Sequence, residues 1–367
     1  MSNPYPNPET ASRSATPAAP RMTELGGRDV IVAYSDVATE FEALRTRAIV
    51  VDRSFRGRMR FFGEKSGEAL TGLVTSDVLA TPPGHGHYAA ALSAKGRIVA
   101  DLRIFAAPVA SSYLVDTPPR AWPGFLAMVK KYVNPRLSGY RDDSHAIRDI
   151  GIFGADARRI VARLTGVAAD VLAALGSFDN LTATTHGAEV LVACVPDLGL
   201  EGYELFVPFE ISDKVWRDAV GAGAVPAGLA AWEIARVEAG RPEWGIDIDE
   251  NTIPQEANFD ELDAISYTKG CYIGQEVVAR VHFRGHVNRH LRGLRAAGEG
   301  APPPTGAQLI DDTGNHVGDV RSAVSSPRLG GIAIGMVRRE ISPGASLTAR
   351  SERGEQRVDV AALPFSA

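Results

Sequence analysis

The pattern of this sequence changes once, near Arg289, and that change limits the folds open to the chain. Before this point helical and strand-like segments alternate, whereas beyond it short strand-like segments are separated by turns such as Thr313-Gly314-Asn315. Short strands in that rhythm are typical of a small β-barrel or sandwich. The 367 residues leave room for more than one domain, since a domain has roughly 100–200 residues. We therefore expect an α+β protein whose C-terminal part is all-β.

Two stretches of the first part have the character of separate lobes. Residues 48–150 alternate strands and helices as an α+β lobe does, and a further α/β stretch runs from Ile147 to about Gly245. Its last helix is expected over residues 228–238, with Gly240 as the C-cap residue. Residues 1–26 are rich in Pro, Ser, Thr, Asn and Ala without an apolar period, so a disordered tail is expected there.

Composition excludes several classes of function. Hydrophobic residues make up 45% and charged residues 23%, and the formal net charge of -5 argues against a dedicated nucleic-acid binder. Cys194 and Cys271 belong to no Cys-x-x-Cys pair, so neither a disulfide framework nor a zinc site is indicated. No apolar run approaches the roughly 18 residues that span a bilayer, and the N-terminus lacks the apolar core of a secretory signal. We expect a cytoplasmic protein without membrane contact.

One cysteine lies in the stretch Lys269-Gly270-Cys271-Tyr272-Ile273-Gly274-Gln275-Glu276. The flanking glycines leave the thiol sterically accessible, and the cations Lys269 and Arg280 favour the thiolate, which is the reactive form. The alternative is a buried cysteine that acts as a small hydrophobic residue. The Lys-Gly-Cys context favours a functional thiol.

This stretch resembles the signature of the folate-binding YgfZ family, together with Pro254-Gln255-Glu256-Ala257-Asn258 before it and Phe283-Arg284-Gly285 after it. That family is related to the T-protein (aminomethyltransferase) of the glycine cleavage system and includes factors that help mature iron–sulfur enzymes. The resemblance implies a three-lobed cloverleaf, with two α/β lobes and a C-terminal β-barrel around a central channel for tetrahydrofolate. The implied parts are a tail over 1–26, a folate-binding region over 27–285, in which a lobe at about 48–146 is inserted between 27–47 and 147–285, and a barrel over 286–367.

A second resemblance concerns catalysis. Residues 96–102, Gly-Arg-Ile-Val-Ala-Asp-Leu, are similar to a Gly-Gly-Ile-x-Asp-Asp-Leu segment of the T-protein, in which an aspartate near folate N10 serves aminomethyl transfer. Only the second aspartate is kept, as Asp101, because Ala100 replaces the first. Asp101 is therefore a candidate catalytic residue and folate contact, or else a hydrogen-bonded structural carboxylate. Tyr88, at an aromatic position before this hairpin, would pack a pterin or fill the core.

Further folate contacts follow from the same resemblance. Residues 236–240 are similar to an Arg-Leu-Glu-Ala-Gly segment whose arginine contacts folate, and the planar fork of Arg236 suits a pterin or a carboxylate. Stacking of Arg236 on Trp232, one helical turn earlier, is the structural alternative. Lys269 and Gln275 of the cysteine motif are also expected to contact the folate.

The departures from the T-protein pattern affect the expected activity. Residues 197–204 correspond to Gly-Tyr-Thr-Gly-Glu-x-Gly-Phe-Glu, and Leu200 occupies the position of the glutamate that holds the pteridine. Glu201 or Glu204 would then have to substitute for that carboxylate, since an unsatisfied polar group costs roughly 1–3 kcal/mol. Together with Ala100, this departure favours folate-dependent assistance over aminomethyl transfer.

Basic residues follow the cysteine motif. Arg280, His282 and Arg284 alternate with apolar residues, which predicts a strand with one basic face for a polyglutamyl tail, RNA or an acidic partner, or merely a solvated face. Gly285 and this strand pattern separate His282 from His286 and His290, so no tri-histidine metal site is expected.

Three functions are consistent with these features. The first is a folate-binding protein that assists maturation or repair of iron–sulfur enzymes, including those that modify tRNA. Its reactive group would be Cys271, and its partners would be iron–sulfur proteins or their assembly machinery. The second is an aminomethyltransferase that uses Asp101 to move a one-carbon unit from a lipoyl-bound carrier to tetrahydrofolate. The third is a folate-independent adaptor with a degenerate pocket.

Overall fold

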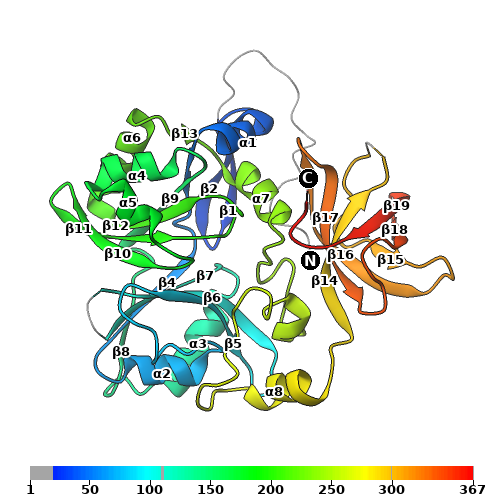
Figure 1. Cartoon of the computed structure of the whole chain (residues 1–367), viewed down its shortest axis with the longest axis horizontal. Coiled ribbons are helices and arrows are strands. Elements are labelled where there is room, and N and C mark those ends of the chain that lie inside the picture. The colour runs from blue at the N-terminus through cyan, green and yellow to red at the C-terminus, as the bar shows by residue number, and fades with distance from the viewer. Residues whose placement is uncertain (1–19, 109–110, 299, 367) are drawn as a thin grey trace.

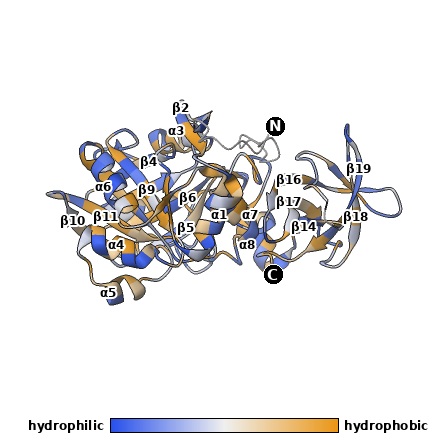
Figure 2. Ribbon diagram, turned by 90° about the horizontal axis from the view of Figure 1, so that it is seen from above, coloured by the Kyte–Doolittle hydropathy of each residue, from blue (hydrophilic) through white to orange (hydrophobic). Residues whose placement is uncertain are grey.

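The computed structural model describes residues 20–108, 111–298 and 300–366. These residues form two sheet-based lobes, a short N-terminal hairpin and a closed six-stranded barrel (Figure 1). Seen from above, the barrel stands at one end of the molecule, beyond α7 (Leu229–Glu238) and α8 (Gln275–Arg284) (Figure 2). The predicted fold class, α+β with two α/β lobes and a C-terminal β-barrel, is confirmed.

The first lobe is built on a six-stranded sheet in the order β10-β11-β12-β9-β3-β13. Helices α4 and α6 pack on it and enclose one apolar core, in which Val50, Ile152 and Leu205 are fully buried. The apolar runs of its strands are therefore explained by the helices that cover them. Its elements are β3 (Ile49–Asp52), β9 (Ile147–Phe153), α4 (Ala157–Thr165), α5 (Ala169–Ala173), β10 (Asn180–Thr185), β11 (Ala188–Cys194), β12 (Gly202–Pro208), α6 (Phe209–Gly221) and β13 (Val225–Pro226).

The second lobe comes from the chain between β3 and β9. Its five-stranded antiparallel sheet has the order β5-β6-β7-β4-β8, and its core includes Phe61, Leu102 and Phe125. On β6, Ala100, Leu102 and Ile104 belong to that core, so the alternate residues Asp101 and Arg103 are directed away from it. Its elements are β4 (Gly57–Phe62), α2 (Ser66–Leu73), β5 (Gly86–Leu92), β6 (Ile98–Ala106), β7 (Ser112–Thr117), α3 (Trp122–Tyr132) and β8 (Gly139–Asp142).

The hairpin of β1 (Arg21–Leu25) and β2 (Arg28–Ala33) corrects one prediction. A tail was expected through residue 26, yet residues 21–25 are a paired strand because Leu25 and Val30 join the main apolar core. Residues 1–19 of the expected tail lie outside the described residues. The helix α1 (Val37–Thr46) follows, with the side chain of Asp36 accepting a hydrogen bond from the Thr39 amide at 3.0 Å.

The strand expected at residues 280–284 is wrong, because this segment is the C-terminal half of α8. The helix follows Gly274, which has φ +83°, and its residue Val277 packs against Gly96 in the β5–β6 hairpin. Val278 is the buried residue of α8, so the helix presents most of its side chains to solvent. Alternating polar residues arose here on the exposed surface of a helix and do not indicate a strand.

The C-terminal barrel closes in the order β14-β17-β16-β15-β18-β19. Its interior is filled by small and branched apolar side chains such as Leu294, Ala333 and Val358. Closure leaves no free sheet edge in the described strands of this domain. The strands are β14 (Arg289–Ala296), β15 (Gln308–Ile310), β16 (His316–Ser326), β17 (Gly330–Arg338), β18 (Ser346–Ser351) and β19 (Gly354–Ala361).

Arg236 of α7 joins the lobes to the barrel. Its guanidinium donates to Glu233 within the helix, to Asp247 at 2.7 Å and to Ser322 of β16 at 2.6 Å, and it also reaches the carbonyl oxygen of Arg241. The side chain is 1% exposed. A buried cation held by two carboxylates is satisfied only while all of these groups stay in place.

We predict that Arg236→Ala lowers the free energy of unfolding by roughly 3–5 kcal/mol, because Glu233 and Asp247 are left as buried charges without their cation. Urea unfolding followed by circular dichroism measures this loss. Arg163→Ala, on the exposed side of α4, is the matched control and should change stability little. Equal effects of the two variants would contradict the structural role of Arg236.

Candidate functional site

The candidate site is a pocket where the two lobes face each other beside α7. Three of the predicted site residues, Tyr88, Asp101 and Arg236, line it. Its volume is about 30 Å³, which is room for roughly one water molecule. Residues that the sequence analysis did not single out also line it: Arg53, Arg56, Arg103, Asp197, Arg241 and Glu243.

Asp101 occupies the centre of this pocket. The Tyr88 hydroxyl donates to its Oδ2 at 2.9 Å, while Oδ1 is buried and has no hydrogen-bond partner in the described chain. Burial raises the pKa of Asp101 to about 7, and Glu243 raises it further against the lowering effect of Arg56. A carboxyl that titrates near neutral pH can accept and return a proton.

The strand also explains the Asp-to-Ala departure before this residue. Ala100 is fully buried in the core of the second lobe, whereas Asp101 lines the pocket. A carboxylate at position 100 would therefore be directed to the lobe core and not to the pocket. The loss of the first aspartate leaves the carboxylate of the pocket unchanged.

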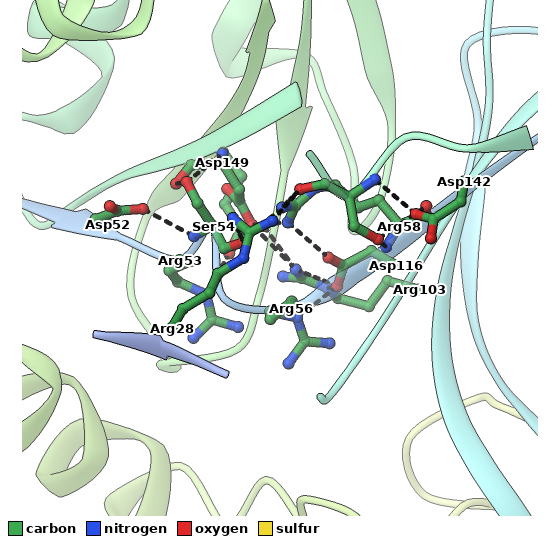
Figure 3. A network of polar contacts seen from close by, with 12 residues as sticks. Arg28, Asp52, Arg53, Ser54, Arg56, Arg58, Arg103, Asp116, Asp142 and Asp149 are labelled. Atoms are coloured by element: carbon green, nitrogen blue, oxygen red, sulfur yellow. Dashed lines mark hydrogen bonds and ion pairs between the residues drawn. The ribbon is translucent and has the colours of Figure 1, made fainter. Parts of the chain in front are cut away.

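An ion network behind the pocket connects the two sheets (Figure 3). Arg103 of β6 donates to Asp116 at 2.6 Å on its own sheet and to Glu204 of β12 at 2.8 Å on the other sheet. Arg56 contacts the same Asp116 oxygen at 2.5 Å. Although burial favours its neutral form, the surrounding arginines, Arg103 first, lower the pKa of Asp116 to about 2.

Arg53 closes the pocket against α7. Its guanidinium carbon lies 3.9 Å from the centroid of the Trp232 ring, and its Nε is 3.0 Å from Glu204. Nη1 of Arg53 and Nε1 of Trp232 are buried without hydrogen-bond partners in the part of the chain that is described. The stacking predicted for Arg236 on Trp232 is therefore made by Arg53, from another lobe.

The pocket carboxylate from the 197–204 segment is Asp197. Glu201 is paired with Arg158 at 2.6 Å, and Glu204 is buried in the ion network. Asp197 lines the pocket and accepts from Arg103 at 3.1 Å. The two glutamates expected as substitutes are thus engaged by protein cations, and the residue that reaches the pocket was missed.

Arg236 reaches the pocket with its donors already in use. Its five N–H groups match the five hydrogen bonds to Glu233, Asp247, Ser322 and the Arg241 carbonyl. A ligand would have to displace one of these acceptors. The guanidinium therefore supports the wall of the pocket in the structure described.

The cysteine motif lies elsewhere. Lys269 is buried, and its ammonium donates to the carbonyl oxygens of Thr71 and Val74 at 2.5 Å and of Ser76 at 2.8 Å. These three bonds fasten the motif to the end of α2, and burial lowers the pKa of Lys269 to about 8. Cys271 is exposed, two residues along the chain, and Gln275 is the first residue of α8. None of the three lines the pocket around Asp101.

Comparison with known proteins now places this architecture. The GCVT N-terminal domain model matches residues 15–264, and the model of the glycine cleavage T-protein C-terminal barrel domain matches residues 289–366. The chain belongs to the glycine cleavage T-protein family. The described part of the chain contains no helix long and apolar enough to cross a membrane.

Individual relatives cover most of both chains. The chain is 30% identical over 320 residues to a protein of Nostoc sp. named aminomethyltransferase, spanning 84% of this chain and 82% of that one. It is also 30% identical over 350 residues to an aminomethyltransferase of Rubrobacter xylanophilus, with 94% and 90% covered. The crystal structure of the glycine cleavage system aminomethyltransferase T from Bartonella henselae matches with a TM-score of 0.85 at 20% identity over 95% of each chain, which shows the shared fold.

The raised pKa of Asp101 predicts a pH-dependent effect of Asp101→Asn on stability. The ordinary carboxyl pKa is 3.8, whereas burial raises the folded value to about 7, so the wild type loses stability between these values as the buried group is forced to ionise. The asparagine cannot ionise. We expect the Tm of the variant minus that of the wild type to be larger at about pH 8 than at about pH 5.

Thermal unfolding at the two pH values measures this difference. Asp311→Asn in an exposed barrel turn provides a control for the general effect of removing one carboxylate. A Tm difference for Asp101→Asn that is the same at both pH values would contradict the shift.

Proposed function

We propose that this chain binds tetrahydrofolate in the pocket around Asp101 and uses this carboxyl in a one-carbon transfer of the aminomethyltransferase kind. The observation that carries the proposal is a buried carboxyl with a pKa near neutral and one oxygen left without a partner, in a protein of the T-protein family. The names of the relatives support the same chemistry, since those described above are called aminomethyltransferase.

The pocket has polar atoms that fit a pterin. A pterin ring presents N–H donors beside a carbonyl acceptor, and the unpartnered Asp101 Oδ1 and Arg53 Nη1 would complement one of each. The ring cannot enter a volume of about 30 Å³, however, so a lining group has to move. Arg53 is the group to move, because it lies on Trp232 as a flat ring would. In this proposal the ring replaces the guanidinium on the indole.

Bound tetrahydrofolate would supply the nitrogen nucleophile that receives the one-carbon unit. The protein then has to hold one proton close to that nitrogen, and Asp101 is suited to this because its charged and neutral forms are nearly balanced at neutral pH. Tyr88 fixes the orientation of the carboxyl through its bond to Oδ2. Burial excludes water that would otherwise level the pKa.

The direct test combines calorimetry and turnover. Wild-type protein should bind tetrahydrofolate saturably and, with a lipoyl-bound aminomethyl carrier protein, release ammonia. Asp101→Asn should keep the affinity within a few fold while losing about 100-fold or more in ammonia release, because proton transfer typically contributes 10²–10⁴-fold. Tyr88→Phe should show a smaller loss.

Asp311→Asn should match the wild type in both measurements. Saturable binding without ammonia release from the wild type would reject the transferase and leave a folate-binding role. Absence of tetrahydrofolate binding would reject the proposal and leave the folate-independent adaptor.

A second function is favoured by a separate observation, the exposed Cys271 on a loop fastened by Lys269. We propose, as the finer alternative, a YgfZ-like role in maturation or repair of iron–sulfur enzymes, including those that modify tRNA. The cage of three carbonyl oxygens fixes the loop, so the thiol is held outward where a partner protein could reach it. Folate binding is common to both functions, and they differ in whether Asp101 or Cys271 is essential.

Complementation separates these functions. In a strain deficient in iron–sulfur enzyme maturation, the YgfZ-like role predicts that Cys271→Ser fails to restore enzyme activity while its Tm and folate affinity stay at wild-type values. Cys194→Ser is the matched control, since that thiol is half-buried and burial raises its pKa to about 11. Full rescue by Cys271→Ser would reject the cysteine-dependent role.

A further inference from the structure

A second and larger cavity lies on the other side of the segment that carries Arg53. It has a volume of about 520 Å³, within the range of roughly 300–1,000 Å³ typical of small-molecule sites. Asp52, Ser54 and Phe55 line this cavity, whereas Arg53 and Arg56 line the pocket of Asp101. The alternation of this segment therefore separates the two spaces. Neither the family comparison nor the proposed function uses the second cavity.

Two arginines without carboxylate partners face this space. Arg28 of β2 donates to the carbonyl oxygens of Ser54 at 3.0 Å and Ser144 at 2.7 Å, and Figure 3 shows its guanidinium reaching Ser54 near Arg58. Arg148 of β9 makes no hydrogen bond or ion pair in the described chain and lies 4.7 Å from the centroid of the Phe209 ring. Burial and the nearby cations Arg148 and Arg58 lower the pKa of Arg28. Two cations crowded together in this way require an anion.

The other charges define which anion fits. His145 accepts from Arg28 through Nδ1 at 2.9 Å, because arginine can only donate, so this imidazole is neutral. Asp29 and Asp52 also line the cavity, but both are exposed to water, whereas the two arginines are half-buried. Water screens the aspartates more than the arginines. One negative charge on the ligand balances this arrangement better than the two charges of a phosphate.

The apolar wall defines the rest of the ligand. Phe209, Tyr34 and Phe55 contribute rings to the lining, and Phe209 is 51% exposed although it begins the buried strand-to-helix connection after β12. The guanidinium over its face leaves a flat apolar surface next to a free set of N–H donors. A planar ring that carries a carboxylate would use both features at once.

We propose that this second cavity binds a small aromatic monocarboxylate, with its carboxylate held by Arg28 and Arg148 and its ring lying against Phe209 and Tyr34. Arg148 determines affinity most directly, because none of its N–H groups is engaged within the described chain. Arg28 has a structural role as well, since it ties the hairpin to both lobes through Ser54 and Ser144.

The test uses the full chain and three probes that share a phenyl ring, namely phenylacetate, L-phenylalanine and phenethylamine. Calorimetry should show saturable binding of phenylacetate to the wild type, and Arg148→Ala should weaken it by about tenfold or more, the loss expected for a charge-assisted contact. Arg163→Ala, which removes an equal charge from an exposed position on α4, should leave the affinity unchanged. Phenethylamine, which lacks the carboxylate, should not bind.

The outcomes decide the proposal. L-Phenylalanine binding tighter than phenylacetate would support the proposal and add an ammonium contact with the aspartates, while equal or weaker binding would support the carboxylate contact alone. Binding of neither carboxylate, equal binding of phenethylamine, or an affinity unaffected by Arg148→Ala would overturn it. Because the two cavities have different linings, Asp101→Asn should not change phenylacetate affinity, so this proposal and the folate proposal can fail independently.

Discussion

The buried contact of Arg103 with Asp116 and Glu204 is the interaction on which the rest of the molecule depends. It joins β6 and β7 of one sheet to β12 of the other, so the relative position of the two lobes is set by charged groups that are almost inaccessible to water. A pair of this kind adds little net stability over apolar packing, but removing one partner leaves an uncompensated charge. The network therefore specifies how the lobes meet more than it strengthens them.

The same network determines the chemistry of the pocket. Arg56 and Arg103 share Asp116, which keeps both guanidinium groups on one side of Asp101, while burial keeps the pKa of Asp101 high. Arg53, also paired with Glu204, lies on Trp232 and leaves a small cavity. Position of the lobes, charge of the carboxyl and access to the pocket are thus linked through a few shared carboxylates.

Elements with one strong local pattern could be predicted from the sequence. The helix before Gly240 and the strand that carries Asp101 lie where the apolar spacing placed them. The failures have particular causes. At Arg280–Arg284 the chain makes an exposed helix whose polar residues alternate by coincidence, and at Arg21–Leu25 a polar strand is stabilised by its partner strand and by two apolar side chains. Local composition carries no record of such tertiary contacts.

The candidate site was partly predictable for a similar reason. Tyr88, Asp101 and Arg236 come together, but the partners of Arg103 are up to a hundred residues away, and no spacing rule connects them. Lys269 seemed placed to act on its neighbour Cys271, yet its ammonium points to the end of α2. The arginines in the segment 53–60 were the overlooked signal, since so many cations in a strand region require buried carboxylates elsewhere.

The most direct measurement is a crystal structure of the chain with tetrahydrofolate. The account predicts a pterin on the Trp232 ring, with its donor edge at the free oxygen of Asp101 and Arg53 displaced from the indole. Folate density located away from this pocket, or a pocket in which Arg53 still lies on Trp232 at saturating ligand, would contradict it.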